Sequence, residues 1–232
     1  MNNLIKDMAY CERPYEKAMS KGVDTLSDAE LLAIILRSGT GSTSSVTLAN
    51  QVLNAHITHK GILGLNFLRR EDYIKIKGIG NTKATLLMAV SELSKRMNLT
   101  SLSAGISFDN PASIGEYYME KCKYFTTEKV FLMLFSNNHS LIKELQLSEG
   151  IINQTLVSTR NIYIEALKYE AVRLVLVHNH PSGDPTPSRA DIDLTKKVKD
   201  SGQLLDILLS DHIIVGHGLY FSMMERGILN EI

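Results

Sequence analysis

One short segment constrains this chain more than any other: an apolar run that leads directly into two histidines. Residues 171–177 read Ala-Val-Arg-Leu-Val-Leu-Val, a composition typical of a strand buried on both faces of a sheet. His178 and His180 follow with one residue between them. Because alternate residues of an extended chain lie on the same side, both imidazoles are expected to project together from one strand end. Residues 181–187 contain three prolines and a glycine, so they predict a rigid loop.

Ser188 and Asp191 open the element that follows this loop. Their Ser-x-x-Asp spacing is close to a capping box, so a helix is predicted from residue 188 to about residue 201. Taken alone, these two residues need only form a helix N-terminus, and the two histidines need only be polar residues at a strand end. The combined spacing His-x-His-x7-Ser-x2-Asp instead favours a joint function in one site.

This set of side chains suits a catalytic zinc site. Two neutral imidazoles and one carboxylate leave the fourth position of a tetrahedral Zn²⁺ open for water, whereas a structural zinc is closed by a fourth side chain. Zinc lowers the pKa of its water to about 7, and a carboxylate beyond the ligands can then move protons to a leaving amine. The hydroxyl of Ser188 could donate to the oxyanion. The two cysteines, Cys11 and Cys122, are too few for a disulfide framework or a four-cysteine zinc site.

The N-terminal part of the chain predicts short helices joined by glycine turns. Residues 27–36 begin with a Ser-x-x-Glu capping box, and residues 45–53 predict the next helix. Farther along, Gly78 and Gly80 flank one apolar residue between two predicted helices, with lysines on either side. Free amides at the start of the second helix would suit a phosphate. The stretch 74–89 resembles the helix-hairpin-helix motif, which implies DNA contact through four residues: Lys77, Gly78, Gly80 and Lys83. The alternative is a turn that serves only packing.

Charge and composition predict two domains. The formal net charge is zero, which argues against a polybasic nucleic-acid-binding chain. Residues 1–100 nevertheless carry a net charge of +4 and residues 101–232 a net charge of −4, which is either a difference between two domains or chance scatter. An uncharged Ser/Gly/Thr stretch predicts a linker near 97–107. We therefore expect a helical domain at 1–100 and a second domain at 101–232. The N-terminus has no apolar signal segment, so a cytoplasmic location is expected.

The histidine, serine and aspartate spacing matches the JAMM (MPN+ or JAB) metalloprotease motif. With the later Asp211-His212-Ile-Ile-Val-Gly216, and with Arg13-Pro14 and Leu26–Leu32 near the N-terminus, the whole chain resembles the RadC family. This resemblance implies one zinc ion held by His178, His180 and Asp191, with Ser188 as the oxyanion or water-orienting hydroxyl. It also implies an upstream glutamate base before a glycine. Glu149 fits that description, and the competing acids are Glu144, Glu165 and Glu170. Asp211 and His212 are either outer partners of the ligands or polar residues at a strand end.

The resemblance also implies a fold and a function. The expected fold is a small all-α helix-hairpin-helix domain followed by a cytidine deaminase-like mixed β-sheet flanked by helices. Patterning predicts strands at 129–135, 141–146, 151–157, 172–178, 203–210, 212–216 and 220–224, and helices near 112–122, 160–170 and 188–201. The expected function is zinc-dependent hydrolysis of peptide or isopeptide bonds in a peptide or protein substrate. The alternatives are a DNA-binding accessory protein of repair or recombination, with a non-catalytic zinc domain, and an interaction scaffold.

Overall fold

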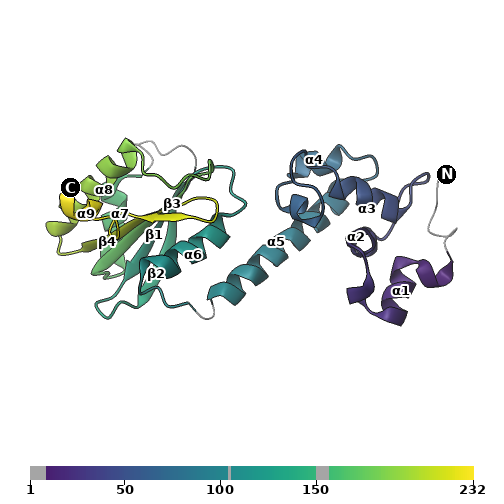
Figure 1. Ribbon diagram of the computed structural model, residues 1–232, viewed down its shortest axis with the longest axis horizontal. Coiled ribbons are helices and arrows are strands. Elements are labelled where there is room, and N and C mark those ends of the chain that lie inside the picture. Colours follow the sequence, from purple (N-terminus) through teal and green to yellow (C-terminus); the bar gives the residue numbers. More distant parts are fainter. Residues whose placement is uncertain (1–8, 104–105, 150–156) are drawn as a thin grey trace. The chain divides into compact units, whose positions relative to one another are not determined.

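The computed structural model describes residues 9–103, 106–149 and 157–232. The chain divides into two compact units between Asn98 and Leu99, within the helix α5 (Asn81–Ser103). Among the described residues, none of the helices is both long and apolar enough to cross a membrane. The elements of each unit are shown in Figure 1.

The first unit is helical. Besides α5, its helices are α1 (Pro14–Lys21), α2 (Asp28–Leu36), α3 (Ser45–Leu53) and α4 (Arg70–Ile74), with short 3-10 helices at Tyr10–Glu12, Val23–Thr25 and Ile62–Asn66. The predicted capping box at α2 is present: the Ser27 hydroxyl accepts from the Glu30 amide, and the Glu30 carboxylate accepts from the Ser27 amide. Apolar faces of α2, α3 and α5 form the core, which includes Leu32, Leu36, Leu48, Val52, Tyr73, Ile79 and Leu87.

A tight turn connects α4 to α5. Gly78 adopts a φ of +102°, a conformation that L side chains rarely adopt. Ile79 points inward and is only 3% exposed, so it fills the space between the helices as the sequence predicts. The Lys83 ammonium donates to the carbonyl oxygens of Ser38 (2.5 Å) and Gly39 (3.4 Å), which fastens α5 to the loop after α2.

The second unit is a mixed five-stranded sheet flanked by helices. Its strands are β1 (Lys129–Phe135), β2 (Leu141–Glu149), β3 (Arg173–Asn179), β4 (Leu208–Val215) and β5 (Tyr220–Ser222), in the order β2-β1-β3-β4-β5. Of these described strands, only β3 and β4 are parallel to each other, and the helix α8 (Arg189–Gln203) connects them. The other helices are α6 (Pro111–Cys122), α7 (Thr159–Lys168) and the short α9 (Ile228–Glu231).

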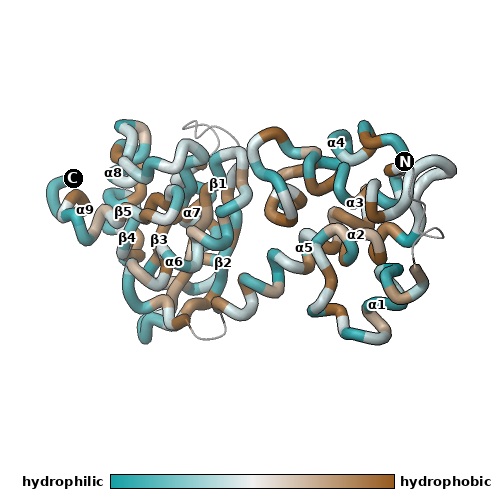
Figure 2. The backbone as a smooth tube through the Cα atoms, turned by 45° about the vertical axis from the view of Figure 1, so that its right-hand side comes forward, coloured by the Kyte–Doolittle hydropathy of each residue, from teal (hydrophilic) through white to brown (hydrophobic). Residues whose placement is uncertain are grey.

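The two faces of the sheet bury different helices. The helix α6 packs on one face, against Phe131, Met133, Val175 and neighbouring apolar residues. Helices α7 and α8 pack on the other face, against Val130, Leu132, Leu176 and their neighbours. Apolar segments accordingly concentrate in the strands of the sheet, and in α2 and α3 of the first unit (Figure 2). Because β1 and β3 are covered on both sides, their sequences are almost continuously apolar.

Two expectations about the elements need correction, and a third lies almost wholly outside the described residues. The chain is helical up to Ser103, so residues 97–103 of the predicted linker belong to α5, and Leu99 packs against the core on the α6 face. The strands predicted at 203–210 and 212–216 are a single strand, β4, because α8 extends to Gln203 and Asp211 lies inside the strand. The strand predicted at 151–157 lies outside the described residues except for Val157, which is in a bend.

We expect Gly78→Ala to destabilise the first unit and Gly80→Ala to leave it almost unchanged. At Gly78 a Cβ atom would lie 2.3 Å from the Thr40 Cγ2 atom and the φ is positive, whereas a Cβ at Gly80 meets open space. The expected loss for Gly78→Ala is roughly 1–3 kcal/mol in the free energy of unfolding, measured by urea denaturation of the full chain. Equal losses in the two variants would contradict this description of the turn.

Candidate metal centre

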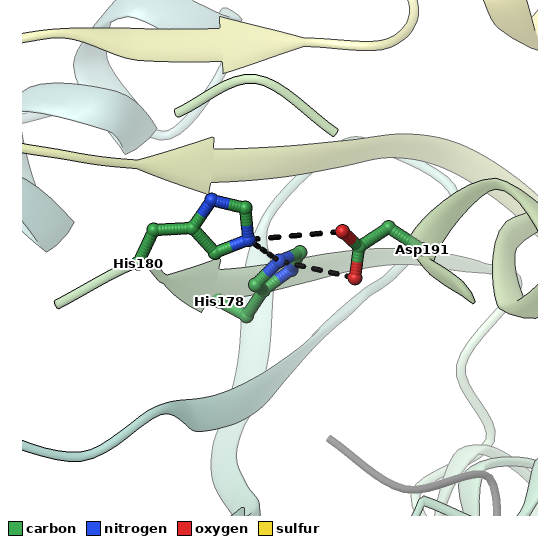
Figure 3. A group of neighbouring side chains, drawn as sticks. All are labelled: His178, His180 and Asp191. Carbon is green, nitrogen blue, oxygen red and sulfur yellow. Dashed lines mark hydrogen bonds and ion pairs between the residues drawn. The ribbon is translucent and has the colours of Figure 1, made fainter. Parts of the chain in front are cut away.

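Three side chains from neighbouring elements converge at the C-terminal end of β3. His178 lies in the strand, His180 directly follows it, and Asp191 lies in the first turn of α8 (Figure 3). The Nε2 atoms of the two histidines are 3.0 Å apart. The Asp191 carboxylate oxygens lie 3.3 Å from the Nε2 of His178 and 3.7 Å from the Nε2 of His180. His178 and Asp191 are buried, and His180 is half-buried.

The start of α8 holds the Asp191 carboxylate in place. Ser188 is the N-cap residue of this helix: its amide donates to the Asp191 Oδ2 atom (2.7 Å), and its hydroxyl accepts from the Asp191 amide (3.3 Å). Burial by itself would raise the pKa of the Asp191 carboxyl. Hydrogen bonds from His178, His180 and Ser188 outweigh this effect and hold the pKa well below its usual range. The third member of the group is therefore a carboxylate anion.

The loop after β3 orients His180. Its Nδ1 atom lies 2.8 Å from the carbonyl oxygen of Asp184, which can only accept, so Nδ1 carries a proton and the neutral imidazole has its lone pair on Nε2. The Asp184 carboxylate accepts from the amide (2.9 Å) and hydroxyl (2.7 Å) of Thr186, which shapes the loop. The hydrogen bond with Asp191 raises the pKa of His180 despite partial burial, and the charge of Glu128 adds to this rise.

The distances within the group fit a tetrahedral metal site. Ligand atoms bound to zinc at its usual N and O bond lengths lie about 3.3–3.6 Å from one another. The two Nε2 atoms are 3.0 Å apart, and they lie 3.3 and 3.7 Å from different oxygens of the Asp191 carboxylate, so the group is close to that range. With one ligand atom from each residue, the three atoms lie within 4.8 Å of one another. Two imidazole nitrogens and one carboxylate oxygen are also a donor set that divalent transition metals accept. Among the described residues, these three form the one group of His, Cys, Asp or Glu that could hold a metal ion.

The acids considered as the general base lie in different places. Glu149 is the last residue of β2, and its Cα pairs with that of Lys129, next to the Val130–His178 pair; its side chain is outside the described part of the chain. Glu144 accepts from Tyr117 (3.2 Å), Tyr118 (2.5 Å) and Lys121 on the α6 face of the sheet. Glu165 pairs with Lys168 (3.3 Å) on α7, and Glu170 is exposed after that helix.

Glu128 is an acid at the site that the sequence analysis missed. It directly precedes β1, whose pairing with β3 ends at Val130 and His178, so the chain at Glu128 lies near the end of β3 that carries the two histidines. Its charge raises the pKa of His180. The side chain of Asn179 fixes this position. Its amide nitrogen donates to the Thr127 carbonyl (3.1 Å), and its oxygen accepts from the Lys129 amide (2.9 Å). The middle residue of His-Asn-His therefore holds the backbone on both sides of Glu128.

Asp211 and His212 lie inside β4 and are buried. The Asp211 carboxylate accepts from the amides of His212 (2.7 Å) and Met224 (2.9 Å) and from the Ser222 hydroxyl (2.6 Å), and burial raises its pKa. The His212 Nε2 atom lies 2.9 Å from the Nδ1 atom of His178. Burial lowers the pKa of His212 to about 3, so this imidazole is neutral at physiological pH.

Of the residues expected to contact DNA, Lys77, Gly78 and Gly80 lie in the turn before α5, and Lys83 lies in the first turn of that helix. Lys77 and Gly80 are exposed, and Gly78 is half-buried. The half-buried Lys83 is occupied by the two carbonyl oxygens that it binds. The turn therefore has a clear packing role, and only Lys77 of the two lysines extends into solvent.

Comparison with known proteins places the chain in a family. Residues 108–228 match the RadC-like JAB domain, and residues 5–85 match the UPF0758 N-terminal domain. Among similar proteins, a UPF0758 protein of Alkaliphilus oremlandii is 38% identical over 97% of this chain and 96% of its own length. A UPF0758 protein of Clostridium botulinum strain Langeland is 39% identical over 98% of this chain and 99% of its own length. The chain therefore belongs to the RadC family, with a RadC-like JAB domain that follows a UPF0758 N-terminal domain.

Proposed function

We propose that the protein is a zinc-dependent hydrolase of amide bonds, acting on peptide or isopeptide linkages. The observation that carries this proposal is the convergence of His178, His180 and Asp191 at separations that suit one tetrahedral ion. Membership of the family supports the proposal, since JAB domains are often metal-dependent hydrolases. The similar UPF0758 proteins carry no functional name, so the chemistry is argued from this chain's own residues.

The three residues would hold the ion and leave one position open. His178 and His180 offer imidazole nitrogens, and Asp191 offers a carboxylate oxygen. When bound, zinc makes a water molecule acidic enough to attack a carbonyl group at neutral pH. A set of two imidazoles and one carboxylate is typical of catalytic rather than structural zinc sites, and no fourth side chain from the described part of the chain joins these three.

A glutamate beside the ligands would move the protons. The sequence favours Glu149, which lies at the end of β2. Among the described side chains we propose Glu128 for this role, because Asn179 holds the backbone on either side of it and its charge acts on His180. A carboxylate here would accept a proton from the attacking water and deliver it to the leaving amine.

Ser188 would stabilise the oxyanion. It is exposed at the N-cap of α8, where its oxygen accepts from the Asp191 amide. Because that bond uses only a lone pair, the hydroxyl hydrogen stays available for donation to a tetrahedral intermediate. The capping function and the proposed catalytic function of Ser188 are therefore compatible.

We expect the full chain to bind one zinc ion and Asp191→Asn to weaken this binding strongly. The matched control is Asp193→Asn, which removes an exposed carboxylate two residues farther along α8. Loss of a residue that hydrogen-bonds to a metal ligand lowers metal affinity roughly 10–100-fold. Loss of a ligand itself should lower the zinc affinity by more than that. Competition with a chelator measures the zinc affinity of both variants. Equal zinc affinity in the two variants, or no zinc in the unmodified protein, would contradict the metal centre.

We also expect zinc affinity to fall as the pH is lowered. The pKa of His180 lies above its ordinary value, so below that raised pKa the metal-free protein holds a proton there that zinc must displace. Below that raised pKa the apparent affinity should fall about tenfold per pH unit for each displaced proton. Calorimetry between about pH 8.5 and pH 6.5, in buffers of different ionisation enthalpy, measures the affinity and the protons released. An affinity that does not change over this range would contradict a site in which zinc displaces a proton from His180.

Comparison of kcat between Glu128→Gln and Glu149→Gln identifies which glutamate is the general base. Each change keeps the shape of the side chain and removes its charge. We expect Glu128→Gln to retain zinc and lose about 10²–10⁴-fold in kcat, while Glu149→Gln changes kcat less, measured on a fluorogenic library of peptide and isopeptide substrates. The opposite ranking would assign the role to Glu149. If the zinc-loaded protein cleaved the library and neither variant slowed that cleavage, proton transfer by a glutamate would be excluded.

A further inference from the structure

A chain of buried hydrogen bonds extends from His178 away from the ligands. The His178 Nδ1 atom lies 2.9 Å from the His212 Nε2 atom. The other nitrogen of His212, Nδ1, lies 2.6 Å from the Thr195 Oγ1 atom. Thr195 Oγ1 in turn lies 2.6 Å from the carbonyl oxygen of Asp191. All three side chains of this Thr195–His212–His178 chain are 0% exposed, so water does not compete for these bonds.

The direction of every bond follows from the Asp191 carbonyl. A carbonyl oxygen can only accept, so Thr195 donates its single hydroxyl hydrogen to it. The Thr195 oxygen must then accept from Nδ1–H of His212. A neutral imidazole has one proton, so the Nε2 atom of His212 carries a lone pair and accepts from Nδ1–H of His178. When His178 is neutral, its lone pair is therefore on Nε2, the atom that lies beside Asp191 and His180.

The nearby sulfur atom does not change this direction. The Sδ atom of Met223 lies 3.3 Å from Thr195 Oγ1 and is a weak acceptor. Whether the hydroxyl hydrogen points to the carbonyl or to the sulfur, it points away from His212. Thr195 therefore acts as an acceptor toward His212 in both cases.

The two ligand histidines are fixed by different means. His180 faces the Asp184 carbonyl, which can only accept, so one contact sets its tautomer. His178 faces another imidazole, which can donate or accept. The contact with His212 alone therefore allows the proton of His178 to be on Nδ1 or on Nε2. We propose that Thr195 and His212 are positioning residues that hold His178 with its proton on Nδ1, so that Nε2 is free to bind the metal. This inference rests on the proposed zinc site for its function, but the His212 tautomer can be tested without a metal.

The direct test is the tautomer of His212. Histidine labelled with ¹⁵N in the zinc-loaded full chain should show His212 protonated on Nδ1 and unprotonated on Nε2. A His212 protonated on Nε2 would overturn the proposal. If the protein held no zinc, the proposed function would fail, and the same spectrum of the metal-free protein would still test the hydrogen-bond chain, because it predicts the same tautomer there.

Variants test the consequence for the metal. Thr195→Val keeps the shape of the side chain and removes the hydroxyl, and we expect it to lower zinc affinity about 10–100-fold. Thr195→Ser should restore the affinity to within about threefold. Ser222→Ala serves as the control, because it removes a buried hydroxyl that binds Asp211 outside the Thr195–His212–His178 chain. Folded Thr195→Val protein with unchanged zinc affinity would overturn the proposal, as would an equal loss in Ser222→Ala. If Thr195→Val does not fold, the tautomer measurement on the unmodified protein decides.

Discussion

Three electron-pair donors held close together, two of them on buried side chains, are the constraint on which the rest of this site depends. The Nε2 atoms of His178 and His180 and the carboxylate of Asp191 lie 3.0–3.7 Å apart, and a buried carboxylate is costly unless it is paired or hydrogen-bonded. A cation among the donors removes that cost. The surrounding elements then have clear functions: β3 supplies a rigid strand end, the proline-rich loop holds His180 through the Asp184 carbonyl, and the N-terminal turn of α8 supplies Asp191.

The start of α8 shows that a structural and a chemical function can share the same atoms. One oxygen of Asp191 accepts the Ser188 amide and completes the capping box, while the other faces His178. The capping box alone would explain the Ser-x-x-Asp spacing, and a metal ligand alone would explain it as well. Both interactions are compatible in the geometry, since capping fixes the carboxylate in the orientation that a ligand needs. The Asp191 main chain has a further contact, because its carbonyl accepts from Thr195 and so connects the helix to the imidazole pair behind His178.

Sequence patterns predicted the local parts of this structure well. The apolar run before His178, the loop after His180 and the helix that begins at Ser188 are set by neighbouring residues, and they lie where the patterns put them. The same holds for α3 and for the capping box of α2. The sequence also shows the apolar stretch at 203–216, but it does not show where α8 ends, so one strand was predicted as two.

Contacts between distant segments could not be predicted in the same way. Glu128 lies 50 residues before His178, and nothing in its local sequence marks it; only the antiparallel register of β1 and β3 brings it to the site. Asn179 and Thr195 were missed for the same reason, because their partners come from other strands and helices. One signal could have pointed to Glu128: it directly precedes β1, the strand that pairs with the His-Asn-His strand β3.

The central claim is that His178, His180 and Asp191 bind one zinc ion and leave a position open. X-ray absorption at the zinc edge, on protein loaded with one equivalent of zinc, tests it most directly. We predict a first shell of four nitrogen and oxygen atoms at about 2.0–2.2 Å, with the multiple-scattering signature of two imidazoles, one of which is lost in His178→Ala. A sulfur ligand, or a spectrum unchanged by that substitution, would contradict the account.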